Sequence, residues 1–179
     1  DNFFYSQSLT ERLKNSIKLT SGAKIFLHPV SNPSSYGIVK LNKKNKILKI
    51  IEKPKKYISD LAITGLYLFD NKVVKYSKKL KPSNRNEYEI VDLLKKYNKN
   101  KKLSLDLIGR GGAWIDAGSI KDFYDASAFV STLENRQGLK IACLEEISFT
   151  NKWITKKEIS EAIKFYGKCG YSNYLKNLI

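Results

Sequence analysis

A single carboxylate, Asp116, lies in a nearly uncharged, glycine-rich stretch, RGGAWIDAGS at residues 110–119. Small residues on both sides of it leave room around the carboxylate. An isolated acid in such a pocket tends to lose its charge unless a cation lies nearby. Mg²⁺ is commonly bound by one or two carboxylates together with substrate phosphates. We therefore expect Asp116 to be a metal ligand, and the alternative is that it caps the helix that begins near Ser119.

Two further stretches could supply substrate-binding groups and a second ligand for such a metal ion. In LKIIEKP, residues 48–54, Glu52 and Lys53 follow two isoleucines, so they are expected at the end of a buried strand. Glu52 can accept hydrogen bonds from sugar hydroxyls, and the Lys53 ammonium suits a phosphate. In DNFFY, Asp1 would be a second metal ligand if a strand preceded it, because α/β sheets bind ligands at strand carboxyl ends. The alternatives are a surface ion pair for Glu52 and Lys53 and a helix cap for Asp1.

A glycine interrupts one of the most apolar strands that the sequence predicts. Gly65 lies inside ITGLYLFD, residues 63–70. Glycine in a strand interior indicates the close approach of a ligand or of another backbone, and the alternative is a β-bulge.

The elements that must position these groups alternate between strands and helices. Apolar runs predict strands at 23–30, 61–70 and 103–109 and a hairpin at 36–54. Amphipathic spacing and end signals predict helices at 8–19, 71–80, 87–99, 118–138, 159–170 and 171–179. This order predicts an α/β fold with a mixed sheet.

The composition narrows the class of protein. The 179 residues are 42% hydrophobic and carry a net charge of +16, which is compatible with anionic small substrates. Only four of the 33 basic residues are arginine, and the lysines are spread along the chain, so we expect solvated faces and no nucleic-acid site. No apolar run approaches the roughly 20 residues of a membrane span, and no signal peptide is evident. Two cysteines without metal-ligand spacing favour free thiols and a cytoplasmic location.

Several blocks, taken in order, resemble the bacterial glucose-1-phosphate thymidylyltransferases. They are DNFFY, YGIVKL, IIEKP, ITGLYLFD, LKPSNRNEYEIVD, RGGAWIDAGS and FVSTLENRQGLKIACLEEISF. The resemblance runs from Asp1 to about Tyr174, and its last block is the most specific. It implies part of a Rossmann-like nucleotidyltransferase fold. Residues 1–138 would be the sugar-phosphate- and metal-binding part, and residues 139–179 a C-terminal helical region used in assembly.

The resemblance also implies an activity and its residues. The family makes dTDP-glucose and pyrophosphate from dTTP and α-D-glucose 1-phosphate. By resemblance, Asp1 and Asp116 hold Mg²⁺, while Lys53 and Arg85 are the catalytic groups that hold the sugar phosphate. The remaining substrate-binding positions implied are Tyr36, Gly37, Glu52, Ile63, Gly65, Tyr67 and Trp114. A regulatory nucleotide site would include Arg110, Glu145 and Glu146, and family members are commonly homotetramers.

One family feature is missing from this sequence. The family's G-G-x-G-T-R-L loop, which binds the triphosphate, does not occur, and the chain has no methionine. We therefore expect a fragment of a longer enzyme, inactive towards dTTP and poorly soluble by itself. Two other interpretations stay open, namely a related sugar-1-phosphate nucleotidyltransferase that uses another nucleoside triphosphate and a non-catalytic sugar-phosphate-binding subunit.

Overall fold

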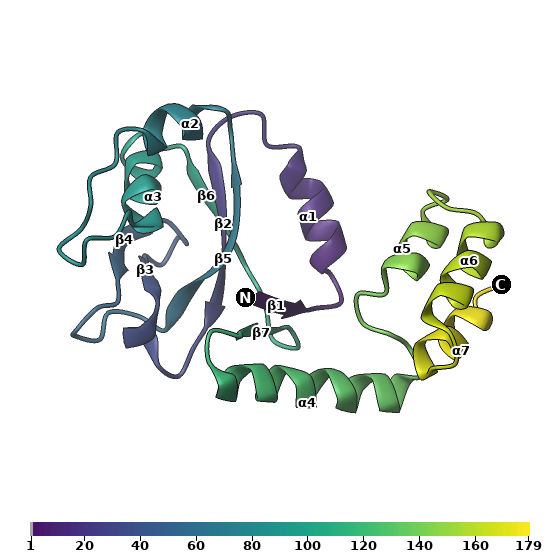
Figure 1. Cartoon of the computed structure of the whole chain (residues 1–179). Coiled ribbons are helices and arrows are strands. Elements are labelled where there is room, and N and C mark those ends of the chain that lie inside the picture. Colours follow the sequence, from purple (N-terminus) through teal and green to yellow (C-terminus); the bar gives the residue numbers. More distant parts are fainter. Residues whose placement is uncertain (1) are drawn as a thin grey trace. The chain divides into compact units, whose positions relative to one another are not determined.

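The computed structural model describes residues 2–179, and the chain forms two compact units, Asp1–Ser119 and Ile120–Ile179. Figure 1 shows the first as a sheet with helices and the second as a group of helices. The metal ligand expected at Asp1 lies outside the described residues. The boundary expected at residue 138 concerned functional parts of one domain, and it stays a prediction; the compact units themselves divide at Ser119.

A five-stranded sheet forms the centre of the first unit, with the strand order β4-β3-β5-β2-β6. Its strands are β2 (Ala23–Pro29), β3 (Gly37–Leu41), β4 (Ile47–Glu52), β5 (Leu61–Phe69) and β6 (Leu103–Leu107). All neighbouring strands are antiparallel except β2 and β6, which are parallel. The predicted α/β fold with a mixed sheet is confirmed, including the hairpin of β3 and β4.

Helix α3 (Ile90–Lys99) covers the apolar side of this sheet. Its Val91 and Leu94 are buried against Ile25 and Val39 of the strands. One turn further round the helix, Tyr97 packs with residues of α2 (Lys72–Ser77) in a second cluster. The expected helix at 87–99 begins three residues later, at Ile90. The residues before it form a loop, and its Arg85 reaches Glu52 of the edge strand β4.

A separate two-stranded ribbon pairs β1 (Asn2–Tyr5) with β7 (Ala113–Asp116). The strands are antiparallel, and Asn2 lies opposite Asp116. Side chains alternate between faces along a strand, so Trp114 and Asp116 share one face with Asn2. The sequence did not predict β1, because four residues without alternation carry no strand signal. Helix α1 (Leu9–Ile17) follows it, and its Arg12 forms an ion pair with Asp106 of β6.

The second unit consists of α4 (Ile120–Gln137), α5 (Leu144–Thr150), α6 (Lys156–Tyr166) and α7 (Gly170–Lys176). Helix α4 ends where Gly138 takes a φ of +70°, as the predicted stop near that glycine required. The buried residues Cys143, Ile159 and Leu175 form the core of α5 to α7. The short helix α5 was not predicted. None of the helices within residues 2–179 is long and apolar enough to cross a bilayer.

Candidate functional site

An open cleft of about 240 Å³ lies where the hairpin of β3 and β4 and strand β5 meet the β1–β7 ribbon. The lining includes nine of the residues that the sequence analysis singled out: Tyr36, Gly37, Glu52, Lys53, Ile63, Gly65, Tyr67, Trp114 and Asp116. Asn2, Ser35, Ile90 and Val91 complete the lining, and the sequence analysis had missed them. The four motifs that carried the hypothesis are thus brought to one place in the tertiary structure.

Asp116 is the last residue of β7 and opens onto this cleft. Within residues 2–179 its carboxylate has no hydrogen bond or ion pair, and the same residues contain no cluster of three or more His, Cys, Asp or Glu side chains suited to a metal. A Cβ placed on Gly118 would lie 3.5 Å from Asp116 Oδ1, so a small residue keeps this side of the carboxylate accessible. One accessible carboxylate beside a phosphate-sized cleft fits Mg²⁺, whose other ligands are typically phosphates and water.

Lys53 reaches the cleft from an unusual backbone conformation. Its φ is +41°, and its N–H donates to the Tyr36 carbonyl at 3.0 Å. Gly37 pairs with Glu52 in the β3–β4 ladder, so Tyr36 and Lys53 follow directly at the open end of the hairpin. A non-glycine residue in the left-handed region costs of order 1–3 kcal/mol, and such strain clusters at functional sites. The turn therefore fixes where the lysine leaves the sheet.

Glu52 is a partly desolvated carboxylate on the cleft wall. Burial raises its pKa most, the neighbouring Glu89 carboxylate raises it further, and Arg85 and Lys53 oppose both effects. A Cβ on Gly37 would lie only 2.9 Å from Glu52 Oε2, so the glycine makes room for this carboxylate. Burial and the nearby Glu52 charge raise the pKa of Tyr67 to about 12. Tyr67 is thus a neutral hydrogen-bonding group at pH 7.

Gly65 meets the side chain of Asn2 rather than another backbone. Its φ is +77°, and a Cβ there would lie 2.8 Å from Asn2 Nδ2. Trp114 Nε1 donates to Asn2 Oδ1 at 2.8 Å, and the Trp114 ring meets that of Tyr36 edge-on at 5.1 Å between centroids. The β2–β5 register also shifts opposite this glycine, so the bulge alternative is correct as well. The sequence gives only a weak signal for Asn2, namely an amide that follows the Asp1 carboxylate in DNFFY.

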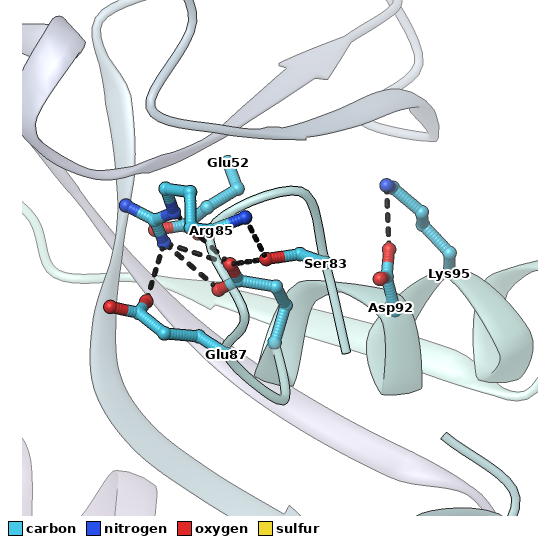
Figure 2. A network of polar contacts seen from close by, with 7 residues as sticks. Glu52, Ser83, Arg85, Glu87, Asp92 and Lys95 are labelled. Atoms are coloured by element: carbon cyan, nitrogen blue, oxygen red, sulfur yellow. Dashed lines mark hydrogen bonds and ion pairs between the residues drawn. The ribbon is translucent and has the colours of Figure 1, made fainter. Parts of the chain in front are cut away.

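Arg85 lies beside the cleft and not on its wall. Its Nη2 is 3.7 Å from Glu52 and 3.0 Å from Glu87 (Figure 2). The same atom is 2.9 Å from Glu89. The hydrogen bond to Glu89 raises the pKa of Arg85 most, and the same bond lowers the pKa of Glu89. The guanidinium is therefore a permanent cation next to the Glu52 carboxylate.

The three residues proposed for regulation lie elsewhere. Arg110 lines a different, mainly apolar cavity of about 360 Å³ with His28 and Ile108. In the helical unit Glu145 accepts hydrogen bonds from the hydroxyls of Tyr166 and Tyr171, and Glu146 accepts one from Tyr174. These bonds join α5 to α6 and α7. A regulatory role for the three residues stays a prediction.

Known proteins are similar to this chain in sequence and in fold. Residues 1–132 match the family described as Nucleotidyl transferase. A glucose-1-phosphate thymidylyltransferase from Neisseria gonorrhoeae is 44% identical over the whole chain, and one from Mycobacterium tuberculosis (strain ATCC 25618 / H37Rv) is 38% identical. The chain spans 62% of the length of each of these two relatives.

Solved structures agree with these matches. A crystal structure from Bacillus anthracis, described as a glucose-1-phosphate thymidylyltransferase in complex with a sucrose, has a TM-score of 0.63 and 36% identity. The match covers 72% of this chain and 51% of that one. A UDP-glucose pyrophosphorylase complexed with UDP-glucose has a TM-score of 0.62 at 22% identity, covering 73% of this chain and 53% of that one, and it shares the fold.

Proposed function

This chain belongs to the nucleotidyl transferase family, as its motifs predicted, and on that premise we propose that the protein containing it is a glucose-1-phosphate thymidylyltransferase. In the proposed reaction a phosphate oxygen of α-D-glucose 1-phosphate attacks the α-phosphorus of dTTP. The new P–O bond gives dTDP-glucose, and the broken one releases pyrophosphate. In-line phosphoryl chemistry of this kind depends on positioning and on charge neutralisation more than on a protein nucleophile.

One observation carries the proposal: a single cleft gathers Glu52, Lys53 and Asp116 from two sheets. These side chains match the parts of a sugar phosphate. The Glu52 carboxylate accepts hydrogen bonds from sugar hydroxyls, and the Lys53 ammonium attracts the phosphate. Arg85, 3.7 Å from Glu52, adds a second cation on the same side. Six further lining residues shape the proposed sugar pocket: Tyr36, Gly37, Ile63, Gly65, Tyr67 and Trp114.

Asp116, with Asp1 as its proposed partner, would hold Mg²⁺. When bound, the ion neutralises the charge of the reacting phosphates and brings them together. Asp116 contributes a carboxylate to the lining of the cleft, on the same ribbon face as Trp114. The carboxylate itself is the group that a substitution can test.

Five wider features of the whole enzyme are also part of the proposal. We propose that dTTP is bound mainly by the part of the enzyme that this chain, which spans 62% of its relatives' length, does not cover, and that the 179 residues alone do not turn over dTTP. Regulation through Arg110, Glu145 and Glu146, a homotetrameric state and a cytoplasmic location complete the proposal.

The decisive experiment measures pyrophosphate release by the complete gene product that contains this chain. With dTTP, glucose 1-phosphate and Mg²⁺ we expect turnover that Asp116→Asn lowers by about a hundredfold or more. Asp60→Asn, which removes an exposed acid just before β5, is the matched control and should retain activity.

The same assay separates the competing functions. Turnover with UTP, CTP or ATP in preference to dTTP would indicate a related nucleotidyltransferase. Binding of glucose 1-phosphate without pyrophosphate release from any nucleotide would indicate a non-catalytic subunit, and the proposed activity would then be withdrawn.

A further inference from the structure

The loop before α3 holds Arg85 through a dense set of polar contacts. Arg85 donates from Nε to Glu89 Oε1 at 3.2 Å and from Nη2 to both Glu89 oxygens at 2.9 and 3.0 Å. Ser83 Oγ donates to the same Glu89 Oε1 at 2.8 Å and accepts from the Arg85 backbone N–H at 3.1 Å. Glu89, at one end of the loop, is therefore bonded to Ser83 at the other end and to Arg85 between them.

The contacts of Glu89 indicate that its side chain holds Arg85 and does not cap helix α3. It precedes α3, yet its side chain makes no capping hydrogen bond to the helix. The side chain is only 11% exposed, whereas that of Glu87, the other close partner of Arg85, is 61% exposed. A carboxylate withdrawn from water requires compensation, and the charge-assisted bonds to Arg85 and Ser83 supply it.

The contacts also decide which part of the guanidinium is available. Glu89 occupies Nε and Nη2, while Nη1 has no hydrogen bond to any of residues 2–179. The guanidinium stays 3.7 Å from Glu52, beyond hydrogen-bond distance. Without Glu89, an arginine next to a partly buried carboxylate would be expected to close onto Glu52. That would occupy both the sugar acceptor and the phosphate donor.

We propose that Glu89 is a positioning residue for the sugar phosphate: it holds the Arg85 guanidinium beside the cleft, with Nη1 directed to an anion and Glu52 left for the sugar. Ser83 supports it by orienting the Glu89 carboxylate. The proposal rests on the proposed function and adds to it. It assigns substrate affinity to a residue that is absent from the wall of the cleft.

The test measures equilibrium binding of glucose 1-phosphate by isothermal titration, and then steady-state turnover, in the complete gene product. Glu89→Gln keeps the shape of the side chain and removes its charge. We expect it to raise the Kd and the KM for glucose 1-phosphate about tenfold, with the KM for the nucleotide changed less than about twofold. Asp92→Asn is the control, because among residues 2–179 this acid of α3 forms its one ion pair with Lys95, on the exposed side of the same helix (Figure 2).

A double-mutant cycle separates positioning from a structural role. If Glu89 acts through Arg85, then Glu89→Gln adds little once Arg85→Ala is present. Equal losses in the two backgrounds would overturn the proposal, as would a Glu89→Gln variant that binds like Asp92→Asn. Ser83→Ala, with an expected increase of about threefold in Kd, decides the matter if Glu89→Gln does not fold.

The outcomes for the two proposals are distinguishable. If the unmodified protein binds glucose 1-phosphate and does not turn over, the proposed activity fails, and the Kd values alone test the role of Glu89. If the unmodified protein does not bind glucose 1-phosphate, the positioning proposal is overturned with it.

Discussion

At the residue scale, Lys53 combines a charged side chain with a backbone conformation that glycine adopts more easily. Its φ of +41° lies at the end of the β3–β4 hairpin, beside Tyr36. Lys101 and Lys152 also have a positive φ, so the conformation alone does not assign a function, and the position of Lys53 on the wall of the cleft is what distinguishes it.

A pair of substitutions separates the two properties of Lys53. Lys53→Gly should be about 1 kcal/mol more stable than Lys53→Ala, because only glycine adopts a positive φ without a steric cost. Both variants should lose affinity for glucose 1-phosphate about tenfold or more, since both lack the ammonium. Urea unfolding and titration calorimetry measure the two effects.

The neighbouring Lys55 offers the matched control, since it is exposed and lacks a positive φ. There the glycine variant should be the less stable of the pair. If glycine is also the less stable choice at position 53, the strain argument is wrong.

Gly65 is a position where one added carbon atom would change the shape of the cleft. Gly65→Ala would place a Cβ 2.8 Å from Asn2 Nδ2 in a backbone with φ +77°. We expect it to cost about 2–3 kcal/mol and to break the Trp114–Asn2 hydrogen bond, because strain and overlap act together. Denaturant unfolding measures the cost, and tryptophan fluorescence reports on the indole.

Gly138→Ala is the comparison for strain alone. Its φ is +70°, and a Cβ there would meet nothing within 4 Å. It should cost only about 1 kcal/mol. Equal costs at the two glycines would mean that Asn2 moves aside freely and does not define the cleft.

At the scale of elements, Asp70 joins three segments around α3. Its carboxylate accepts hydrogen bonds from the N–H of Gly22 at 2.7 Å, the Tyr97 hydroxyl at 2.8 Å and the N–H of Lys72 at 3.1 Å. The bond from Gly22 lowers the pKa of Asp70 most, against the opposing effect of burial. One acid thus connects the start of β2, the start of α2 and the last turn of α3.

This arrangement predicts a pH dependence of stability. Because the pKa of Asp70 is lower in the folded state, its contribution is complete above the unfolded value of about 3.9 and disappears as the pH falls through the folded value. Asp70→Asn should lower the unfolding free energy by about 1–2 kcal/mol at pH 7, and by less at pH 3. Urea unfolding across this pH range measures both. A loss that is the same at pH 7 and pH 3 would contradict the assignment.

At the scale of the whole molecule, the two compact units have separate cores. The sheet unit is built on residues such as Ile25 and Leu94, and helices α5 to α7 are built on Cys143, Ile159 and Leu175. Separate cores imply that damage to one has its main effect on the elements around it.

Ile159→Ala tests this organisation. Ile159 is fully buried, so truncation should cost about 2–5 kcal/mol, and Ile159→Val only about 0.5–1.5 kcal/mol. Hydrogen exchange should accelerate in α5 to α7 while β2 and β5 keep their protection. Equal acceleration in those two strands would show that the units unfold together.

Local pattern in the sequence was sufficient for much of this protein. The α/β class, the hairpin and helices such as α4 follow from periodicity and from glycine stops, which are properties of neighbouring residues. Candidate site residues can also be recognised in short motifs, because Asp116 is isolated among small residues and Glu52 and Lys53 end an apolar strand. These features, with Gly65 inside its apolar strand, identified four residues of the cleft wall. The family resemblance added Tyr36, Gly37, Ile63, Tyr67 and Trp114.

Only the tertiary structure decided which distant groups meet. Asn2 and Trp114 are 112 positions apart, and their hydrogen bond depends on the pairing of β1 with β7. The partnership of Glu89, Arg85 and Glu52 likewise depends on how the loop before α3 reaches the end of β4. Local spacing determines which face of a strand or helix is apolar, but strand register and loop path are set by packing between segments far apart in the chain.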